Sequence, residues 1–279
     1  MPCVADALTA GQAALQSCSE TARLDAEVLL AKVTGKSRTQ LFAWPDANLP
    51  ETTVKAYEQL VAKRAAGQPV AYLTGEQEFW SLSLAVNAST LIPRPETERL
   101  VELALEYIHT HQATKVLDLG TGSGAIACAL MSDRSDINMT ITDQSVAALE
   151  TATHNIKRHT NASVSPALGD WFDAVGDERF DLIVSNPPYI AVNDPHLTQG
   201  DVAAEPRTAL ISGKDGLDDL RKIIAEAPDH LHRPGGLMVE HGYQQAAAVR
   251  QLFQQHQFQN IRSFHDLSGH ERVTAGVQP

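Results

Sequence analysis

The sequence feature that most constrains the fold is a regular alternation of short apolar segments and longer amphipathic segments from Lys115 onward. The apolar segments have the length and composition of buried β-strands, and the amphipathic segments have helical periodicity. This alternation predicts an α/β fold in which an open, mostly parallel sheet carries helices on both faces. Ligands of such sheets bind beyond the carboxyl ends of the strands, so the residues that follow each strand are the first candidates for a functional site.

Strands and helices are expected to alternate along this region. Strands are predicted at 116–119, 139–143, 164–168, 180–185, 237–240, 261–264 and 272–275, the last two as a closing pair. Helices are predicted at 124–131, 145–158, 217–231 and 244–256. Gly235 and Gly236 are expected to turn the chain into the strand at 237–240.

Two shorter regions precede the sheet. Residues 1–70 have helical periodicity, with Gly35 suited to the C′ position of one helix and Thr52 or Thr53 suited to cap another. Residues 71–94 include apolar residues with a period of two, which is typical of a β-hairpin. We therefore predict a helical N-terminal domain that recognises the substrate at 1–70, a β-hairpin linker at 71–94 and a ligand-binding domain at 95–279.

Charge and cysteine content narrow the classes of partner. The net charge of −12, from 22 basic and 34 acidic residues, argues against a nucleic-acid partner. Affinity for nucleic acid comes largely from contacts of Lys and Arg with phosphates. No apolar run approaches the roughly 18 residues that span a bilayer, and no signal peptide is seen. Cys3, Cys18 and Cys128 have no metal-like spacing and are expected to be small buried residues in a reducing compartment. We expect a cytoplasmic monomer without a metal site.

A glycine-rich segment follows the predicted strand at 116–119. Alternate glycines let backbone N–H groups approach a ligand closely, and the N-terminus of the following helix favours a carboxylate. Taken alone, the segment is weak evidence for a nucleotide-like ligand, since a tight strand-to-helix turn explains it equally well. Its residues are Asp118, Leu119, Gly120, Thr121, Gly122, Ser123 and Gly124.

Acidic and aromatic residues follow the next two predicted strands. Asp143 ends the strand at 139–143, near the spacing at which an acidic residue accepts hydrogen bonds from ribose hydroxyls, although it also suits a cap of the next helix. After the third strand, Asp170 is placed to bind an adenine amino group and Trp171 to cover the base, unless Trp171 only packs against the sheet edge. Together with the glycines, these residues predict a pocket for an adenosine with a charged tail.

The strand at 180–185 ends in Asn186, Pro187, Pro188 and Tyr189. The two prolines fix φ and remove two backbone donors, so the carbonyls beside them cannot continue a ladder. Asn186 adds a side-chain carbonyl and Tyr189 adds a flat ring. A planar group with N–H bonds to donate therefore finds acceptors and a stacking surface here, whereas the alternative is a strand followed by a Pro-rich turn.

These motifs together resemble a known family. The glycine-rich segment, Asp143 and the tetrad at 186–189 look like a class I S-adenosylmethionine-dependent methyltransferase that acts on a planar nitrogen. The segments FWSL at 79–82, LIPRPETE at 91–98 and VSNPPYI at 184–190 resemble the HemK/PrmC family, the peptide chain release factor glutamine N5-methyltransferases. The resemblance covers nearly the whole chain, and the segment at 91–98 is more specific than the tetrad.

The resemblance implies a Rossmann-like domain with a mostly parallel seven-stranded sheet, S-adenosylmethionine as cofactor, and bacterial-type release factors as substrate. The methylated residue would be the glutamine of their Gly-Gly-Gln motif. The family pattern assigns cofactor contacts to the positions of Gly120, Thr121, Gly122, Ser123, Gly124, Asp143, Asp170, Trp171 and Asn186. It assigns substrate contacts to the positions of Asn186, Pro187, Pro188, Tyr189, Arg94 and Glu205.

Two details of this assignment stay open. Arg94 either faces the active site or forms an ion pair with Glu98 in the linker. Ala203 and Ala204 stand before Glu205, where the family commonly has a larger residue, often aromatic, immediately before Glu-Pro. That departure puts a detail of the pocket lining in question.

A mechanism follows from these assignments. Asn186 Oδ1 and the Pro187 carbonyl are expected to accept the two N–H bonds of the substrate amide, and Tyr189 is expected to stack on the amide plane. One alternative is an N6-adenine methyltransferase acting on DNA or RNA, because an adenine amino group fits the same acceptors. Another is a module that binds S-adenosylmethionine without catalysis.

Overall fold

The computed structural model describes residues 2–160 and 162–279, and the chain divides into two compact units. One unit comprises Met1–Glu76 and Thr198–Ala204, and the other comprises Gln77–Leu197 and Glu205–Pro279. The boundaries proposed from the sequence, at 70/71 and 94/95, stay a prediction. The expected hairpin is present within 71–94, although α5 (Val70–Thr74) occupies the first part of that range.

The N-terminal unit is helical. Its remaining helices are α1 (Val4–Leu15), α2 (Ala22–Thr34), α3 (Arg38–Ala43) and α4 (Glu51–Ala65). Leu29 and Leu30 of α2 are fully buried in the core that these helices share. Arg64 Nε donates to Asp25 at 2.8 Å, and Arg64 Nη1 donates to Asp201 at 2.5 Å. This partly buried guanidinium therefore fixes the returning segment 198–204 to the helices of its own unit.

Three local predictions in this unit can be compared with the structure. Gly35 has the expected left-handed conformation at the end of α2, with φ of 65°. The prediction that Thr52 or Thr53 caps the next helix is wrong, because α4 already begins at Glu51, directly after Pro50. Pro50 is itself the N-cap residue of α4, so Glu51 already occupies the first helical position. Cys18 is exposed and Cys3 is only partly buried, so the expectation of three buried cysteines holds for Cys128 alone.

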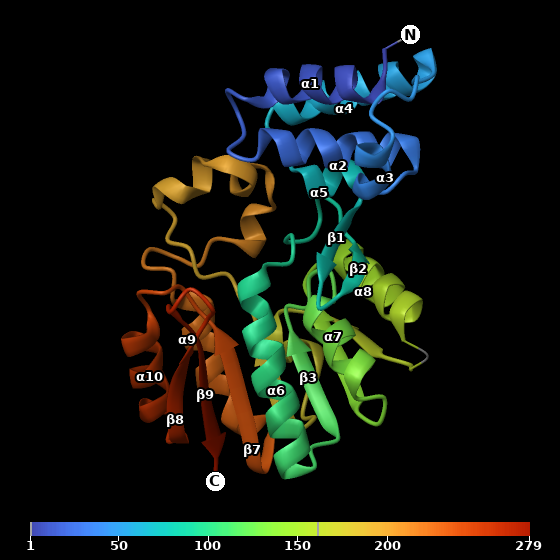
Figure 1. Cartoon of the computed structure of the whole chain (residues 1–279). Helices are drawn as coiled ribbons and strands as arrows, with labels where there is room; N and C mark the ends of the chain where they lie inside the picture. Colours follow the sequence, from blue (N-terminus) through green and yellow to red (C-terminus); the bar gives the residue numbers. More distant parts are fainter. Residues whose placement is uncertain (1, 161) are drawn as a thin grey trace. The chain divides into compact units, whose positions relative to one another are not determined.

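The second unit is built on a seven-stranded sheet in the order β5-β4-β3-β6-β7-β9-β8, which confirms the predicted α/β class (Figure 1). The pairs from β5 to β7 are parallel, and β9 is antiparallel to both β7 and β8. Because β3 begins the reversal of strand order, the crevice beyond its carboxyl end is the expected ligand site. The strands are β3 (Lys115–Leu119), β4 (Asn138–Asp143), β5 (Ser165–Leu168), β6 (Phe180–Ser185), β7 (Leu231–Glu240), β8 (Gln259–His265) and β9 (Glu271–Gln278).

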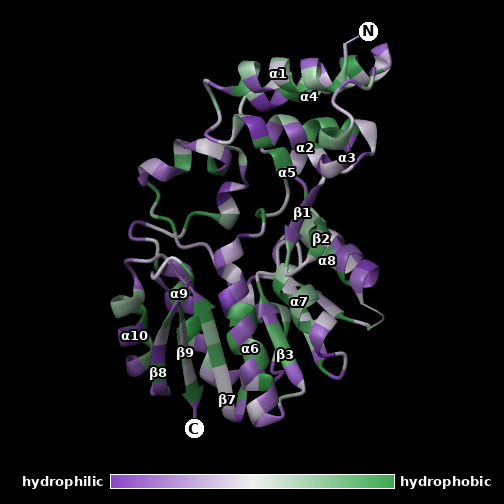
Figure 2. Cartoon of the chain, in the orientation of Figure 1, coloured by the Kyte–Doolittle hydropathy of each residue, from purple (hydrophilic) through white to green (hydrophobic). Residues whose placement is uncertain are grey.

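Helices cover both faces of this sheet. One core cluster joins side chains of the sheet to α6 (Glu98–His111), α7 (Ala125–Asp133) and α8 (Val146–His159). The other joins the opposite face to α9 (Asp218–Glu226) and α10 (Ala246–Gln255). In Figure 2, α6 carries both hydrophobic and hydrophilic residues, as expected for a helix with one buried face. Alternate residues of β6 divide between the clusters: Val184 belongs to the first and Ile183 to the second.

The hairpin consists of β1 (Glu76–Phe79) and β2 (Leu82–Ala85). Its two turn residues, Trp80 and Ser81, both have positive φ, at 54° and 59°. Such turns suit the twist of paired strands but strain non-glycine residues. Trp80 N donates to the Glu98 carboxylate at 2.9 Å, and Ser81 N donates to the Glu78 carboxylate at 2.7 Å. The backbone N–H groups of both turn residues therefore have hydrogen-bond acceptors.

Two predicted boundaries near α9 and β7 are wrong. The helix expected over 217–231 ends at Glu226 and continues only as a short 3₁₀ turn, because Pro228 cannot donate to the helical ladder. The strand expected at 237–240 begins at Leu231, so Gly235 and Gly236 lie inside β7 and do not precede it. The register of β6 and β7 shifts between Phe180 and Leu182, and these glycines lie opposite that irregularity.

No helix of the described residues is long and apolar enough to cross a membrane. Within the same residues, no three His, Cys, Asp or Glu side chains are grouped so that they could hold a metal ion.

Candidate active site

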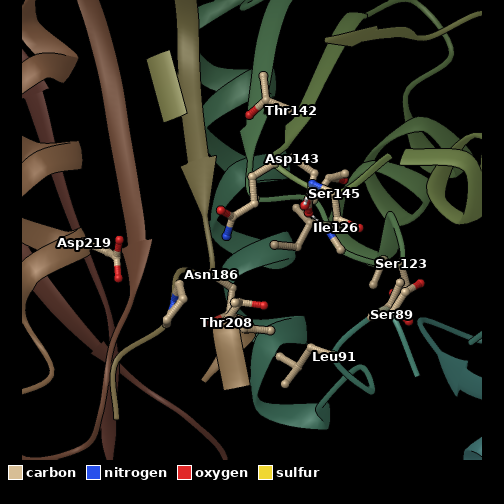
Figure 3. Close-up of a pocket in the computed structure, with 18 of the residues that line it drawn as sticks. Ser89, Leu91, Ser123, Ile126, Thr142, Asp143, Ser145, Asn186, Thr208 and Asp219 are labelled. Atoms are coloured by element: carbon tan, nitrogen blue, oxygen red, sulfur yellow. Dashed lines mark hydrogen bonds between the residues drawn. The ribbon is translucent and has the colours of Figure 1, made fainter. Parts of the chain in front are cut away.

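A cavity of about 330 Å³ opens beyond the carboxyl ends of β5, β4, β3 and β6 (Figure 3). The chain leaves these four adjacent strands at Gly169, Asp143, Gly120 and Asn186, which all line or border the cavity. In the view of Figure 3, Asp219 lies on one side of Asn186, whereas Ser123 and Ser89 lie on the other. The volume falls within the range of pockets that enclose a small organic ligand.

The glycine-rich segment forms the floor of the cavity. Gly120, Thr121, Gly122 and Ser123 line it, whereas Gly124 does not. Gly122 has φ of 56°, and a Cβ at this position would enter open space, so its backbone is accessible to a ligand. Gly124 has φ of 79°, and its added Cβ would lie 2.9 Å from the backbone of Ala152 in α8. Gly124 therefore serves the packing of α7 on α8, which the sequence pattern alone did not separate from ligand binding.

Asp118, the first residue of this segment, carries a fully buried carboxyl group. Thr121 Oγ1 donates to Asp118 Oδ2 at 2.6 Å, but Asp118 Oδ1 has no hydrogen-bond partner among the described residues. Burial raises the pKa of Asp118 to about 7. Through its hydrogen bond with Thr121, the buried carboxyl group of Asp118 thus fixes the first turn of the glycine-rich segment.

Asp143 combines the two roles that the sequence left open. Its Oδ2 accepts from Gly122 N at 3.0 Å, and its Oδ1 accepts from Ser145 N at 2.9 Å, next to the start of α8. Desolvation raises the pKa of this carboxyl group, and the backbone hydrogen bonds oppose that shift. Each oxygen keeps a second lone pair, so Asp143 can still accept from hydroxyl groups in the cavity that it lines.

Trp171 and Asp170 form the side of the cavity beyond β5. Trp171 has φ of 49°, and its ring lies 3.0 Å from the point where a Cβ on Gly120 would stand. Its indole Nε1 donates to Asp219 Oδ1 at 3.2 Å, and Asp170 accepts from Lys222 Nζ at 2.5 Å. The indole plane is thereby held over the glycine-rich segment, where a flat base can stack on it.

Asn186 is the first residue after β6 and is partly buried. Its Nδ2 donates to Thr97 Oγ1 at 3.1 Å. No hydrogen bond within the described residues uses Asn186 Oδ1. The amide is therefore fixed with its donor end toward Thr97 and its acceptor end available in the cavity.

Arg94 pairs with Glu205 and not with Glu98. The Arg94 guanidinium contacts Glu205 Oε1, and Glu205 Oε2 accepts from Ile92 N at 3.1 Å. Glu98 instead accepts from Trp80 N. Arg94 lines the cavity, whereas Glu205 is buried behind it. This outcome resolves the alternative that the sequence left open.

The remaining residues of the tetrad differ in whether they line the cavity. Pro188 lines the cavity, whereas Pro187 and Tyr189 do not. The Tyr189 hydroxyl donates to Glu240 Oε1 at 3.3 Å, and the ring packs against the core cluster of α9 and α10. Burial, with a contribution from Glu240, raises the pKa of Tyr189 above its ordinary value. The stacking role expected for Tyr189 stays a prediction.

Sequence reasoning missed several residues that line the cavity. Thr97 and Leu91 belong to the segment at 91–98, from which only Arg94 was chosen. Asp219 is separated from Trp171 by 48 positions, and the sequence contains no pattern that pairs them. Thr208 comes from the loop after Glu205, a region without periodicity.

The residues that line the cavity fit S-adenosylmethionine. Open space faces the backbone of Gly122, a carboxylate with free lone pairs stands at the end of β4, and an indole covers the segment between them. These groups match a carboxylate-bearing tail, a ribose and an adenine, in that order.

Comparisons with known proteins identify the family of this chain. The model of the PrmC N-terminal domain matches residues 6–75, and the model of the methyltransferase small domain matches residues 98–205. The release factor glutamine methyltransferase of Xylella fastidiosa (strain Temecula1) is 49% identical over 258 residues, covering 92% of this chain and 94% of that protein. The enzyme of that name from Vibrio cholerae is 48% identical, covering 94% of this chain and 91% of that protein.

Solved structures support the same fold at lower identity. The hMettl16 catalytic domain, in complex with a MAT2A 3′UTR hairpin, superimposes with a TM-score of 0.55 at 16% identity, over 89% of this chain and 92% of that one. A methyltransferase from Pyrococcus furiosus gives a TM-score of 0.52 at 17% identity, over 77% and 96%. The chain therefore belongs to the family of release factor glutamine methyltransferases, class I enzymes that use S-adenosylmethionine to methylate a glutamine side chain at N5.

Proposed function

We propose that this chain methylates the glutamine of the Gly-Gly-Gln motif in bacterial-type peptide chain release factors, with Asn186 as the residue that presents the amide nitrogen. The observation that carries the proposal is the orientation of Asn186. Its Nδ2 donates to Thr97 at 3.1 Å, which leaves Oδ1 as an acceptor beside the glycine-rich segment. The relatives that share nearly half of its residues are named for release factor glutamine methylation.

The chemistry requires positioning more than acid–base catalysis. An amide nitrogen is a weak nucleophile, because its lone pair is delocalised into the carbonyl. The bound cofactor supplies a methyl group on a positively charged sulfur. Asn186 Oδ1 and the Pro187 carbonyl accept the two N–H bonds of the substrate amide, which directs the nitrogen and favours the positive charge that develops on it. The nitrogen becomes acidic as it is methylated, so its proton passes to an acceptor or to water without a strong base.

The other residues have supporting roles in this proposal. Gly120, Thr121, Gly122 and Ser123 hold the cofactor tail, and Asp143 accepts from the ribose. Asp170 and Trp171 bind the base. Arg94, held by buried Glu205, borders the substrate together with Pro188, and Tyr189 is proposed to stack on the plane of the substrate amide.

The experiment is a transfer assay with isotopically labelled S-adenosylmethionine. Three substrates are compared: a full-length release factor, its Gly-Gly-Gln→Gly-Gly-Ala variant, and double- and single-stranded nucleic acid. We expect label only on the unmodified release factor. Label on the Gly-Gly-Ala variant, or on nucleic acid alone, would refute the proposed substrate and favour adenine N6 methylation or another acceptor.

We also propose that the protein substrate is met in the cytoplasm by a monomeric enzyme, and that nucleic acid is not a direct substrate. The net charge of −12 supports this exclusion, because nucleic acid binding rests on excess Lys and Arg. Gel filtration with light scattering tests the oligomeric state, and a dimer would refute that part.

A further inference from the structure

Two buried polar side chains lie behind Asn186, and the proposed chemistry has not used them. Thr97 is the last residue of the short 3₁₀ turn Pro95–Thr97 and directly precedes α6, with 4% of its surface exposed. Glu240 is the last residue of β7, the strand beside β6, and is 1% exposed. All three residues belong to the same compact unit.

Hydrogen bonds join these groups in a fixed direction. Asn186 Nδ2 donates to Thr97 Oγ1 at 3.1 Å. The Thr97 hydroxyl lies within reach of the Glu240 carboxylate and lowers the pKa of that group. A threonine hydroxyl has one hydrogen, and because Thr97 Oγ1 accepts from Asn186, that hydrogen is left to donate to the carboxyl oxygen beside it. Thr97 therefore donates to Glu240 and offers a lone pair to Asn186. Tyr189 donates to Glu240 Oε1 from the other side, at 3.3 Å.

The direction matters because the two ends of an Asn amide differ in polarity. A flipped Asn186 would point its NH₂ group at the N–H bonds of the substrate amide, so two donors would meet. The flipped side chain would also place Oδ1 against Thr97 Oγ1, whose hydrogen already points to Glu240. Two acceptors would then face each other, and the buried pair would lose a hydrogen bond worth about 1 kcal/mol.

We propose that Thr97 and Glu240 are positioning residues for methyl transfer, which orient Asn186 through this hydrogen-bond relay so that Oδ1 faces the substrate amide. The inference rests on the proposed function of Asn186. Thr97 and Glu240 act through Asn186 and Tyr189, and neither needs to touch the transferred methyl group.

The cost of burying Glu240 supports a role other than stability. Its Oε2 has no hydrogen-bond partner among the described residues. Arg272 stabilises the charge of Glu240 from β9, whereas Glu96 repels it, and burial is the largest influence. A well-packed apolar residue usually fills such a position at lower cost than an uncompensated carboxylate. A carboxylate at position 240 does, however, provide a hydrogen-bond acceptor for Thr97 and Tyr189, and this role explains its presence in the core.

The test uses matched pairs of variants in the full chain. Thr97→Val removes the hydroxyl at nearly constant volume, and Thr97→Ser keeps it. Glu240→Met removes the acceptor, and Glu240→Gln keeps a carbonyl that accepts from Thr97. For each variant, kcat is measured with a release factor, the dissociation constant of S-adenosylmethionine by calorimetry, and folding by circular dichroism.

We expect Thr97→Val and Glu240→Met to lower kcat by about 10- to 100-fold, in line with the cost of misplacing a reacting group. Cofactor affinity should change by no more than about threefold, and Thr97→Ser and Glu240→Gln should recover most of the turnover. If Thr97→Val has the turnover of the unmodified protein, the relay is refuted. The same holds if Thr97→Ser is as impaired as Thr97→Val.

A double variant separates positioning from a general structural effect. In single-turnover assays, Thr97→Val should cost little more in an Asn186→Ala background, because the group that it orients is gone. An equal loss in both backgrounds would overturn the proposal. If Asn186→Ala itself keeps near-normal turnover, the proposed function fails. If Asn186→Ala is impaired and Thr97→Val is not, only the positioning role fails.

Discussion

Replacing Glu240 by glutamine should change how the stability of the protein depends on pH. Burial raises the pKa of Glu240 from 4.5 to about 7. In the unfolded chain the group ionises near its ordinary value. Between these two values the unfolded state therefore binds fewer protons than the folded state, so the free energy of unfolding falls as pH rises.

The size of the effect follows from the shift. At about 1.4 kcal/mol for each pKa unit, ionising Glu240 costs the folded state about 3 kcal/mol above pH 7. Below pH 4.5 the group is protonated in both states and this cost is absent. Glutamine is neutral throughout, so Glu240→Gln should match the unmodified protein at low pH and be more stable by about 3 kcal/mol at high pH.

The measurement is thermal or urea unfolding of both proteins at about pH 4.5 and about pH 8, on either side of the sequence pI of 5.3. A gain of about 3 kcal/mol corresponds to a rise of about 5–10 °C in midpoint at the higher pH. Asp118, whose pKa is also raised to about 7, contributes in the same direction, but it is present in both proteins and cancels in the difference. A difference in stability that does not grow with pH would refute the reasoning.

Three further changes separate packing from binding. Gly124→Ala should destabilise the protein by about 2–4 kcal/mol in urea unfolding, because its Cβ would lie 2.9 Å from Ala152 at a positive φ. Gly122→Ala, whose Cβ meets nothing within 4 Å, is the control and should cost about 1–2 kcal/mol; equal costs would contradict the packing argument. Asp143→Asn should weaken cofactor binding by at least about tenfold in calorimetry, through loss of a charged acceptor. Unchanged affinity would remove Asp143 from the cofactor site. Glu205→Ala should cost about 3 kcal/mol, because it leaves a buried backbone N–H and a guanidinium without their acceptor, and a loss below about 1 kcal/mol would argue against that contact.

The sequence predicted the parts of this protein that depend on local pattern. Short apolar runs such as 180–185 are strands because only a sheet buried on both faces accommodates them, and the residues after those strands converge by topology. The structure accordingly brings Gly122, Asp143 and Asn186 to the lining of one cavity. Their individual chemical roles stay proposals.

The parts that were missed depend on contacts between distant segments. Nothing in the pattern around Gly124 indicates that Ala152 fills the space beside it. Thr97 and Glu240 are 143 positions apart and come together only because α6 packs beside β7. The start of β7 was misplaced because its first residues are polar or turn-forming, and pairing with β6 overrides that local preference.

The most direct test of the account is mass spectrometry of release factor peptides after incubation with S-adenosylmethionine and either the unmodified enzyme or Asn186→Ala. We predict one methyl group on the glutamine of the Gly-Gly-Gln peptide with the unmodified enzyme. With Asn186→Ala, the rate should fall by about 10²- to 10³-fold while cofactor affinity changes by no more than about threefold. Methylation at another residue, or near-normal methylation by Asn186→Ala, would contradict the account.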